Sequence, residues 1–201
     1  MSNVWKKVVV FLGSTRNNRI GDRVGKFVCR KLKEKNLDVI FVDPVEYTLP
    51  LLNKPCHFYR GTENPPQQLS DMDKHIIESD AIVVVSAEYN HSIPPALSNT
   101  LDHFGPRSYE RKPSAIITYS PSVVGGARAG MQLRAMLGEL GCISISNMFT
   151  ISQVHKCFDE NGMPLDTEPG SHMDSGIERC LKQLEWWANA AKYQRDTNGG
   201  F

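Results

Sequence analysis

The chain has 201 residues, 40% of them hydrophobic, and a formal net charge of +1 at pH 7. This size and composition predict one domain with a sizeable core over residues 1–195, followed by a disordered tail at residues 196–201. The balanced charge, with no basic stripe interleaved with aromatics, argues against nucleic-acid binding, and apolar runs of strand length only argue against a membrane span.

Apolar runs and helical periodicities alternate along the chain. Five apolar runs predict strands at residues 7–12, 38–42, 81–86, 114–119 and 142–146. Five segments with helical spacing predict helices at residues 20–35, 69–79, 96–104, 127–140 and 176–193. The proline-rich segment 44–67 and the polar segment 147–175 are predicted to be long loops, whose roles the sequence leaves open.

This alternation predicts an α/β fold of three layers, in which helices cover both faces of a five-stranded parallel sheet, and one such arrangement is the flavodoxin-like order 2-1-3-4-5. Ligands of such sheets bind at the carboxyl ends of the strands. The first, third and fourth strands are neighbours in this order. We therefore expect the loops that follow them, at residues 13–20, 87–93 and 120–126, to form one continuous pocket rim.

The first of these loops contains the segment G-S-T-R-N-N-R-I-G at residues 13–21. Backbone N–H groups at a helix start, two hydroxyls and two arginines together favour a phosphate ligand. The spacing matches neither the dinucleotide fingerprint G-x-G-x-x-G nor a Walker loop. In the alternative interpretation, Ser14 only caps the following helix and the arginines are solvated.

The other two loops each carry a weaker signal. In the loop after the third strand, Tyr89 could stack on a flat ligand, with polar groups beside it for hydrogen bonds, or could simply pack on the surface of an ordinary loop. In the loop after the fourth strand, Gly125 and Gly126 allow close approach of the backbone. A flat heterocycle with a phosphate tail accounts for all three loops together.

The three loops resemble one family along residues 7–147. They carry the motifs G-S-T-R-x-x-R-I-G, E-Y-N-H-S-I-P-P-A-L-S-N-T-L-D and S-x-x-x-x-G-G. These motifs are similar to those of the NADPH-dependent FMN reductases, which have a flavodoxin-like fold and include NAD(P)H:quinone, azo-dye and chromate reductases. The resemblance implies bound FMN, with NADPH or NADH as co-substrate. It also implies a ping-pong transfer of hydride through the flavin to a quinone, an azo compound or free flavin.

The resemblance also implies which residues bind FMN. The expected phosphate contacts are Ser14, Arg16, Arg19, Ile20 and Gly21. The residues expected to line the isoalloxazine, largely through backbone groups, are Glu88, Tyr89, Asn90 and His91, with Ser120 and Gly125 on the other side of the ring. No side chain needs to act as a general acid or base, because the chemistry takes place at the flavin N5 atom.

Two positions depart from the pattern of the family. Many members have proline before the E-Y-N motif, where this chain has Ala87. Many have serine in the first loop, where this chain has Arg19. Because arginine can also donate to a phosphate, FMN binding is still expected.

Two other functions remain open at this stage: a one-electron carrier of the flavodoxin type, and a non-catalytic sensor or scaffold that responds to the redox state of the flavin. Carriers tend to be strongly acidic, which the net charge of +1 does not match. The resemblance implies a homodimer or homotetramer. The preference between NADPH and NADH and the physiological acceptor are not determined by the sequence.

The cysteines and histidines show no metal-ligand spacing, so no metal is expected. The five cysteines are scattered and form no C-x-x-C pair, which favours a reducing compartment and a cytoplasmic protein. The position of His91 in the second motif would let it donate to a quinone oxygen or to the flavin edge. We favour a contribution from its backbone alone, because nothing in the sequence identifies a partner for its ring.

Overall fold

A computed structural model of the chain describes residues 4–61 and 63–199. Its strands form one parallel sheet in the order β2-β1-β3-β4-β5, with β6 also paired to β4. This order confirms the predicted topology. The strands are β1 (Lys7–Leu12), β2 (Asp38–Val42), β3 (Ala81–Ala87), β4 (Pro113–Tyr119), β5 (Ile143–Ser144) and β6 (Phe149–Ile151).

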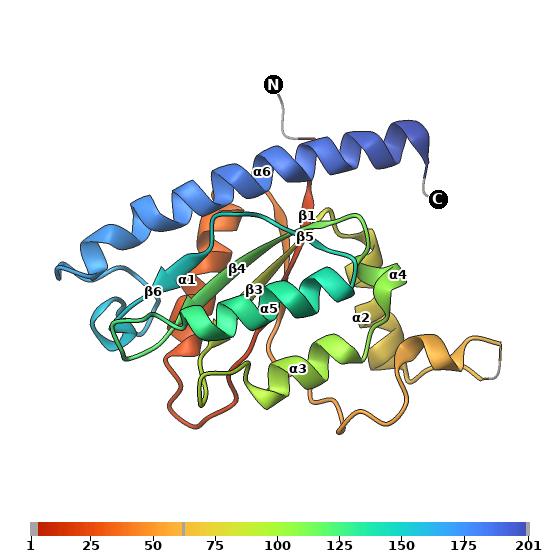
Figure 1. Ribbon diagram of the computed structural model, residues 1–201, viewed down its shortest axis with the longest axis horizontal. Helices are drawn as coiled ribbons and strands as arrows, with labels where there is room; N and C mark the ends of the chain where they lie inside the picture. Colours follow the sequence, from red (N-terminus) through yellow and green to blue (C-terminus); the bar gives the residue numbers. More distant parts are fainter. Residues whose placement is uncertain (1–3, 62, 200–201) are drawn as a thin grey trace.

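Helices cover both faces of the sheet, as the buried clusters and Figure 1 show. Helices α1 and α6 pack on one face, and α2, α3 and α5 pack on the other. The three-layer architecture is therefore the one predicted. The helices are α1 (Gly21–Lys33), α2 (Gln67–Glu78), α3 (Pro95–Asp102), α4 (Pro106–Tyr109), α5 (Ala127–Glu139) and α6 (Met173–Asn198), with 3-10 turns η1 (Cys56–Tyr59), η2 (Val154–Lys156) and η3 (Gly170–His172).

The central strands are apolar along their length because both of their faces are covered. In β1, Val8 and Val10 enter the core beneath α1 and α6, while Val9 and Phe11 enter the core on the other face. Every residue of β3 and β4 is buried. Side chains alternate between the faces of a strand, so only a continuous apolar run satisfies two cores.

The outer edge of the sheet differs from the single strand that was predicted at residues 142–146. Two short strands share the outer edge of β4: β5 pairs with Pro113 and Ser114, and β6 pairs with residues 117–119. Strand β6 lies inside the segment 147–175 that was predicted to be a loop, and this part of the prediction was wrong. The backbone of the buried strand β4 needs hydrogen-bond partners along its edge, and β6 supplies them after a short polar interruption.

The end of the chain is also more ordered than predicted. Helix α6 continues to Asn198, so the prediction of a disordered tail was wrong for residues 196–198. Arg195 donates to the carbonyl oxygen of Arg111 and pairs with Asp80, and Lys192 pairs with the same carboxylate. These contacts hold the last turns of α6 on the sheet. Residues 200 and 201 lie outside the described residues.

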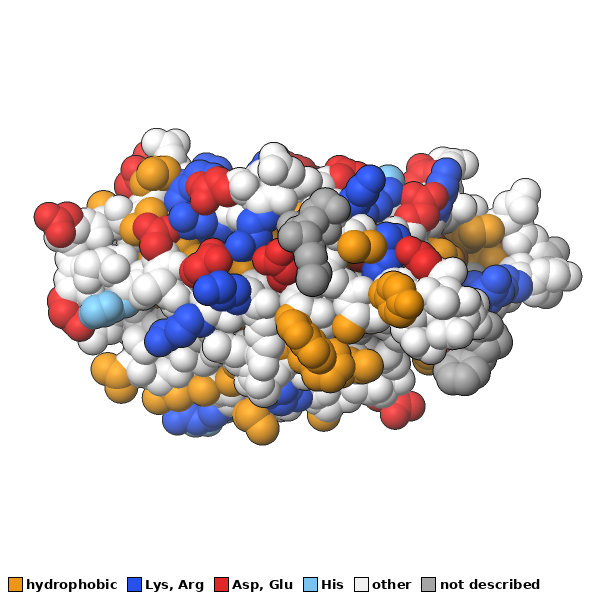
Figure 2. All heavy atoms as spheres, turned by 90° about the horizontal axis from the view of Figure 1, so that it is seen from above, with side chains coloured by type: hydrophobic (Ala, Val, Ile, Leu, Met, Phe, Trp, Pro, Cys, Tyr) orange, Lys and Arg blue, Asp and Glu red, His pale blue; other side chains and the backbone are white. Residues whose placement is uncertain are grey.

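The face along which α6 runs carries mixed charges, and Figure 2 shows Lys and Arg side chains interspersed with Asp and Glu. Ion pairs connect the region of α1 to α6: Lys31 of α1 pairs with Asp174, and Lys35, which follows α1, pairs with Glu178. No extended basic surface is seen on this face. Among the described helices, none is long and apolar enough to cross a membrane.

Candidate functional site

The three candidate loops meet at the carboxyl edge of the sheet, because β1, β3 and β4 are neighbours. There they enclose a cavity of about 230 Å³. Seven of the eleven candidate residues line it: Ser14, Arg16, Arg19, Ile20, Glu88, Tyr89 and Ser120. The other four, Gly21, Asn90, His91 and Gly125, lie on the same loops or at the start of α1 but do not line the cavity.

The loop before α1, which contributes to the lining of this cavity, contains backbone donors that no described protein group uses. Within the described residues, no protein group accepts a hydrogen bond from the backbone N–H groups of residues 15–18. Helix α1 begins at Gly21, and its N-cap residue, Ile20, forms no side-chain cap. Unsatisfied N–H groups and the positive end of the helix dipole together make an anion site.

Ser14 does not cap α1, so the alternative interpretation of this residue was wrong. Its buried hydroxyl is hydrogen-bonded to the Tyr89 hydroxyl, with 2.6 Å between the oxygens. The bond joins the first candidate loop to the second. The ring of Tyr89 also lies beneath the Arg16 guanidinium, whose central carbon is 3.7 Å from the ring centroid.

The two arginines of the loop differ in their partners. Arg16 is exposed and forms no ion pair with any described residue. Arg19 is paired with both Asp22 and Asp43, and it also donates to the carbonyl oxygen of Ser14. Arg16 is therefore the cation available to an anionic ligand, whereas the guanidinium of Arg19 is largely engaged by protein groups.

Asn90 and His91 form the tip of a tight turn. The backbone groups of Tyr89 and Ser92 exchange two hydrogen bonds, of 3.0 and 2.9 Å. Asn90 and His91 lie between them with φ angles of 51° and 62°, in the left-handed region. Gln132 of α5 donates to the carbonyl oxygen of His91 and accepts from Ser92, which fixes the turn against the helix.

The carboxylate of Glu88 contacts the start of α5, which was not predicted from the sequence. It accepts hydrogen bonds from the backbone N–H groups of Arg128 and Ala129, at 3.0 and 3.3 Å, and pairs with the Arg128 side chain. Glu88 thus caps the N-terminus of α5 from another loop. Burial favours the neutral carboxyl, but these hydrogen bonds outweigh burial and hold the pKa of Glu88 below its ordinary value.

The third wall of the cavity is formed by Tyr119, Ser120, Pro121 and Val154. The Tyr119 hydroxyl is buried and has no hydrogen-bond partner among the described residues. Burial raises the pKa of Tyr119, which keeps this hydroxyl protonated as a donor. A buried donor without a protein partner is uncommon in folded proteins, and this residue is one of those that line the cavity.

Gly125 lies next to this wall and packs against the backbone of β6. Its φ of +64° is in the left-handed region, and a Cβ there would lie 3.1 Å from the Ile151 backbone. Its carbonyl oxygen accepts a hydrogen bond of 2.9 Å from Thr118. The glycine therefore allows the third loop to pack closely on β6.

Several residues that line the cavity were not among the candidates predicted from the sequence: Asn17, Asn18, Ala87, Tyr119, Pro121 and Val154. Most of them lie in the three loops already identified, and only their contact with the cavity was missing. Val154 is different, because it follows the unpredicted strand β6. Its backbone N–H donates to the carbonyl oxygen of Ser120, which brings η2 to the cavity. The segment F-T-I at residues 149–151 is too short for its alternation to identify a strand from the sequence.

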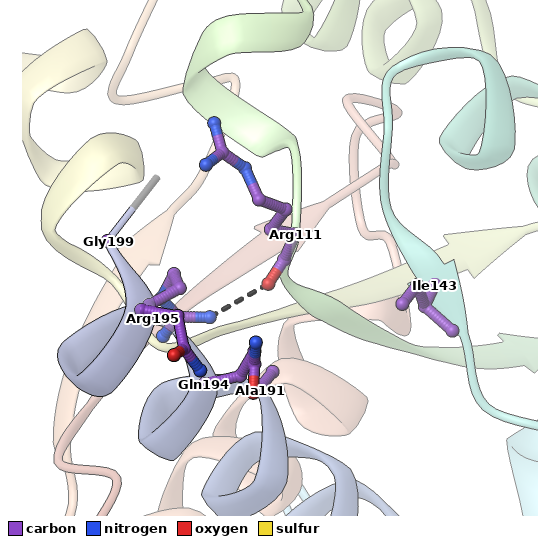
Figure 3. A pocket seen from close by; sticks show the side chains of 7 residues that line it. Arg111, Ile143, Ala191, Gln194, Arg195 and Gly199 are labelled. Atoms are coloured by element: carbon purple, nitrogen blue, oxygen red, sulfur yellow. Dashed lines mark hydrogen bonds between the residues drawn. The ribbon is translucent and has the colours of Figure 1, made fainter. Parts of the chain in front are cut away.

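A second cavity, of about 300 Å³, lies at the opposite edge of the sheet (Figure 3). Arg111 precedes β4 and Ile143 begins β5, so this cavity is at the amino ends of these strands. Arg195 crosses it to reach the carbonyl oxygen of Arg111, as the dashed line shows. None of the candidate residues line it.

The chain is similar in sequence to known flavin and quinone reductases. The family described as NADPH-dependent FMN reductase matches residues 6–156. A quinone reductase of Pseudomonas putida is 32% identical over 169 residues, which cover 81% of this chain and 86% of that protein. An NAD(P)H-dependent FMN reductase of Schizosaccharomyces pombe is 29% identical over 136 residues, covering 67% of this chain and 66% of that protein.

A solved structure with a similar fold is FerB, a flavoenzyme NAD(P)H:(acceptor) oxidoreductase from Paracoccus denitrificans. It superposes with a TM-score of 0.67 at 27% sequence identity. The superposition covers 92% of this chain and 94% of FerB. The similarity therefore extends over nearly the whole of both chains.

Proposed function

We propose a cofactor site and a reaction for this chain, which belongs to the family of NADPH-dependent FMN reductases. The chain is an oxidoreductase that uses FMN and NAD(P)H. The cavity at the carboxyl edge of the sheet is the proposed FMN site. The observation that carries this proposal is the set of unpartnered N–H groups at residues 15–18, at the start of α1.

The phosphate of FMN is proposed to lie against these N–H groups. A phosphate dianion needs several donors and a positive potential, and the loop offers both. Arg16 is the proposed ionic partner, because it is exposed and forms no ion pair with the described residues. Arg19 is proposed to shape the loop rather than to supply charge, since its guanidinium is already engaged by Asp22 and Asp43.

The isoalloxazine is proposed to extend along the second and third loops. Asn90 and His91 would offer backbone groups from the tip of their fixed turn, as the resemblance implies. Ser120 and Gly125 would lie on the other side of the ring. Tyr119 is the residue we add to this set, because its protonated hydroxyl has no partner among the described residues.

The reaction proposed for the chain is hydride transfer from NAD(P)H to an acceptor by a ping-pong mechanism. FMN, when bound, would supply the redox chemistry that links NAD(P)H to the acceptor. The protein residues bind and orient the cofactor and leave one face open to both substrates in turn. Because one relative is a quinone reductase and another an FMN reductase, we propose quinones, azo compounds or free flavin as acceptors.

Assembly and compartment are also proposals. Exposed apolar side chains follow β2, with Val45 53%, Leu51 86% and Phe58 61% accessible. A homodimer or homotetramer is proposed because the resemblance implies one, and these side chains are candidates for its contact surface. All five cysteines are free thiols, which supports a reducing compartment such as the cytoplasm.

The proposal is tested by an absorption spectrum. The purified protein is incubated with FMN, desalted, and measured before and after anaerobic addition of NADPH or NADH, with menadione added last. We expect retained flavin that bleaches with the nucleotide and recovers its colour with the quinone. Flavin that is retained but not reduced would contradict the proposed reaction. Complete loss of flavin on desalting would contradict the proposed site.

A further inference from the structure

Arg19 connects three parts of the chain that surround the proposed phosphate site. It donates to the carbonyl oxygen of Ser14, at the beginning of the loop. It pairs with Asp22, in the first turn of α1. It also pairs through both terminal nitrogens with Asp43, the residue that follows β2. The path of the loop between β1 and α1 is therefore fixed by one guanidinium.

Asp43 is a rigid anchor for this guanidinium. Its side chain is only 8% exposed, and Oδ1 accepts from Arg19 at 2.8 Å and from the Val45 backbone N–H at 2.9 Å. Its carbonyl oxygen accepts hydrogen bonds from Glu46 and Tyr47, at 3.0 and 2.7 Å. The preceding residue is paired in register with β1. The carboxylate thus has a fixed position relative to the sheet.

The charges show that this pair does not attract phosphate electrostatically. Arg19 carries one positive charge, and Asp22 and Asp43 carry two negative charges, so the group sums to −1. A buried carboxylate beside a phosphate site repels the ligand, so its presence there calls for another role. The bidentate geometry with Arg19 supplies that role, because it restricts the guanidinium to one orientation.

We propose that Asp43 is a positioning residue for FMN binding, which keeps the loop at residues 14–20 in its phosphate-binding form through Arg19. Asp43 does not itself line the cavity, so it acts only through the arginine. This inference rests on the proposed phosphate site. It extends that proposal by assigning a role to a buried acidic residue outside the three loops.

The test compares Asp43→Asn with Asp22→Asn in the apoprotein. Both changes remove one carboxylate from Arg19, but the Asp22 side chain is 45% exposed and the Asp43 side chain is 8% exposed. Affinities for FMN and for riboflavin, which lacks the phosphate, are measured by quenching of flavin fluorescence. For Asp43→Asn we expect FMN to bind about tenfold more weakly or worse, and riboflavin to change less than about twofold. For Asp22→Asn we expect a change in FMN affinity below about threefold.

The direction of the change distinguishes positioning from simple electrostatics. Removing a negative charge near the phosphate predicts tighter FMN binding if charge alone matters, and weaker binding if Asp43 positions the loop. The ³¹P NMR signal of bound FMN is a second readout, and we expect it to shift toward the free position in Asp43→Asn. Tighter or unchanged FMN binding, with an unchanged ³¹P signal, would overturn the proposal.

Two further measurements distinguish a loss of folding from a loss of phosphate binding. Urea unfolding of the apoproteins shows whether Asp43→Asn folds, and if it does not, Arg19→Lys replaces it. Lysine keeps the charge but cannot form the bidentate contact, so we expect the same selective loss of FMN affinity, and full FMN affinity in Arg19→Lys would overturn the proposal. Wild-type protein that binds FMN no better than riboflavin would refute the phosphate site itself. If wild type and the variant used prefer FMN over riboflavin to the same extent, the role of Asp43 is refuted and the phosphate site is not.

Discussion

The contact between Glu88 and the start of α5 gives a quantitative prediction for Glu88→Gln. The carboxylate accepts two backbone hydrogen bonds, from Arg128 and Ala129, and is only 7% exposed. An amide at this position loses the charge, and each of the two bonds weakens by about 1 kcal/mol. The ion pair with the Arg128 side chain contributes little more, because that side chain is 46% exposed. We expect the free energy of unfolding to fall by about 2 kcal/mol.

The assay is urea unfolding of the apoprotein at pH 7, followed by tryptophan fluorescence, with buried Trp5 among the reporters. The matched control is Glu168→Gln, since the Glu168 side chain is 86% exposed and, among the described residues, pairs only with His172. We expect the control to change stability by less than about 0.5 kcal/mol. A loss below about 0.5 kcal/mol in Glu88→Gln as well would refute the assigned capping role.

The same contact predicts a dependence on pH. The pKa of Glu88 is lowered in the folded protein from its ordinary value of 4.5. A lowered folded-state pKa means that the stabilisation is complete above that ordinary value and is lost as the pH falls through the folded-state pKa. The stability difference between wild type and Glu88→Gln should therefore be constant from pH 7 to about 5 and shrink below 4.5. A difference that grows on acidification would contradict this reasoning.

Two further substitutions test the walls of the cavity. In Arg16→Ala, the loss of one charge-assisted phosphate contact should weaken FMN binding by about 1.5–3 kcal/mol without affecting riboflavin, as titration of flavin fluorescence would show; equal effects on both flavins would remove Arg16 from the phosphate site. In Gly21→Ala, the new Cβ would overlap the Tyr119 hydroxyl, and we expect about 1–3 kcal/mol less stability in urea unfolding. Because Tyr119→Phe removes the overlapping oxygen, the cost of Gly21→Ala should be smaller in that background, and an unchanged cost would refute the steric explanation.

The sequence was sufficient for the central architecture. Strands β1, β3 and β4 are apolar runs of the length predicted, to within one residue at their ends. Their order in the sheet placed the three loops at one edge, and the cavity lies there. Helix α5 ends within one residue of its prediction, and Gly141 follows it with a φ of +89°, the left-handed conformation that a helix C-terminus favours.

The tertiary structure decided which partner each polar side chain of the site has. Arg19 was predicted to contact the ligand, and the fold brings it to Asp43, 24 residues later in the sequence. Glu88 was predicted to line the ring, and the fold brings it to the start of α5, 40 residues later. Nothing local specifies such pairs, because they form between loops that only the completed sheet brings together.

The sequence by itself determined the elements whose signal is periodic burial, since a strand covered on both faces must be apolar throughout. It could not determine the short strand β6, whose three residues are too few for periodicity and which forms because the edge of β4 needs partners. It also could not show that the Tyr119 hydroxyl would be buried without a partner among the described residues. Hydrogen bonds and ion pairs are satisfied at a distance of about 3 Å in space, and separation along the chain does not encode that distance.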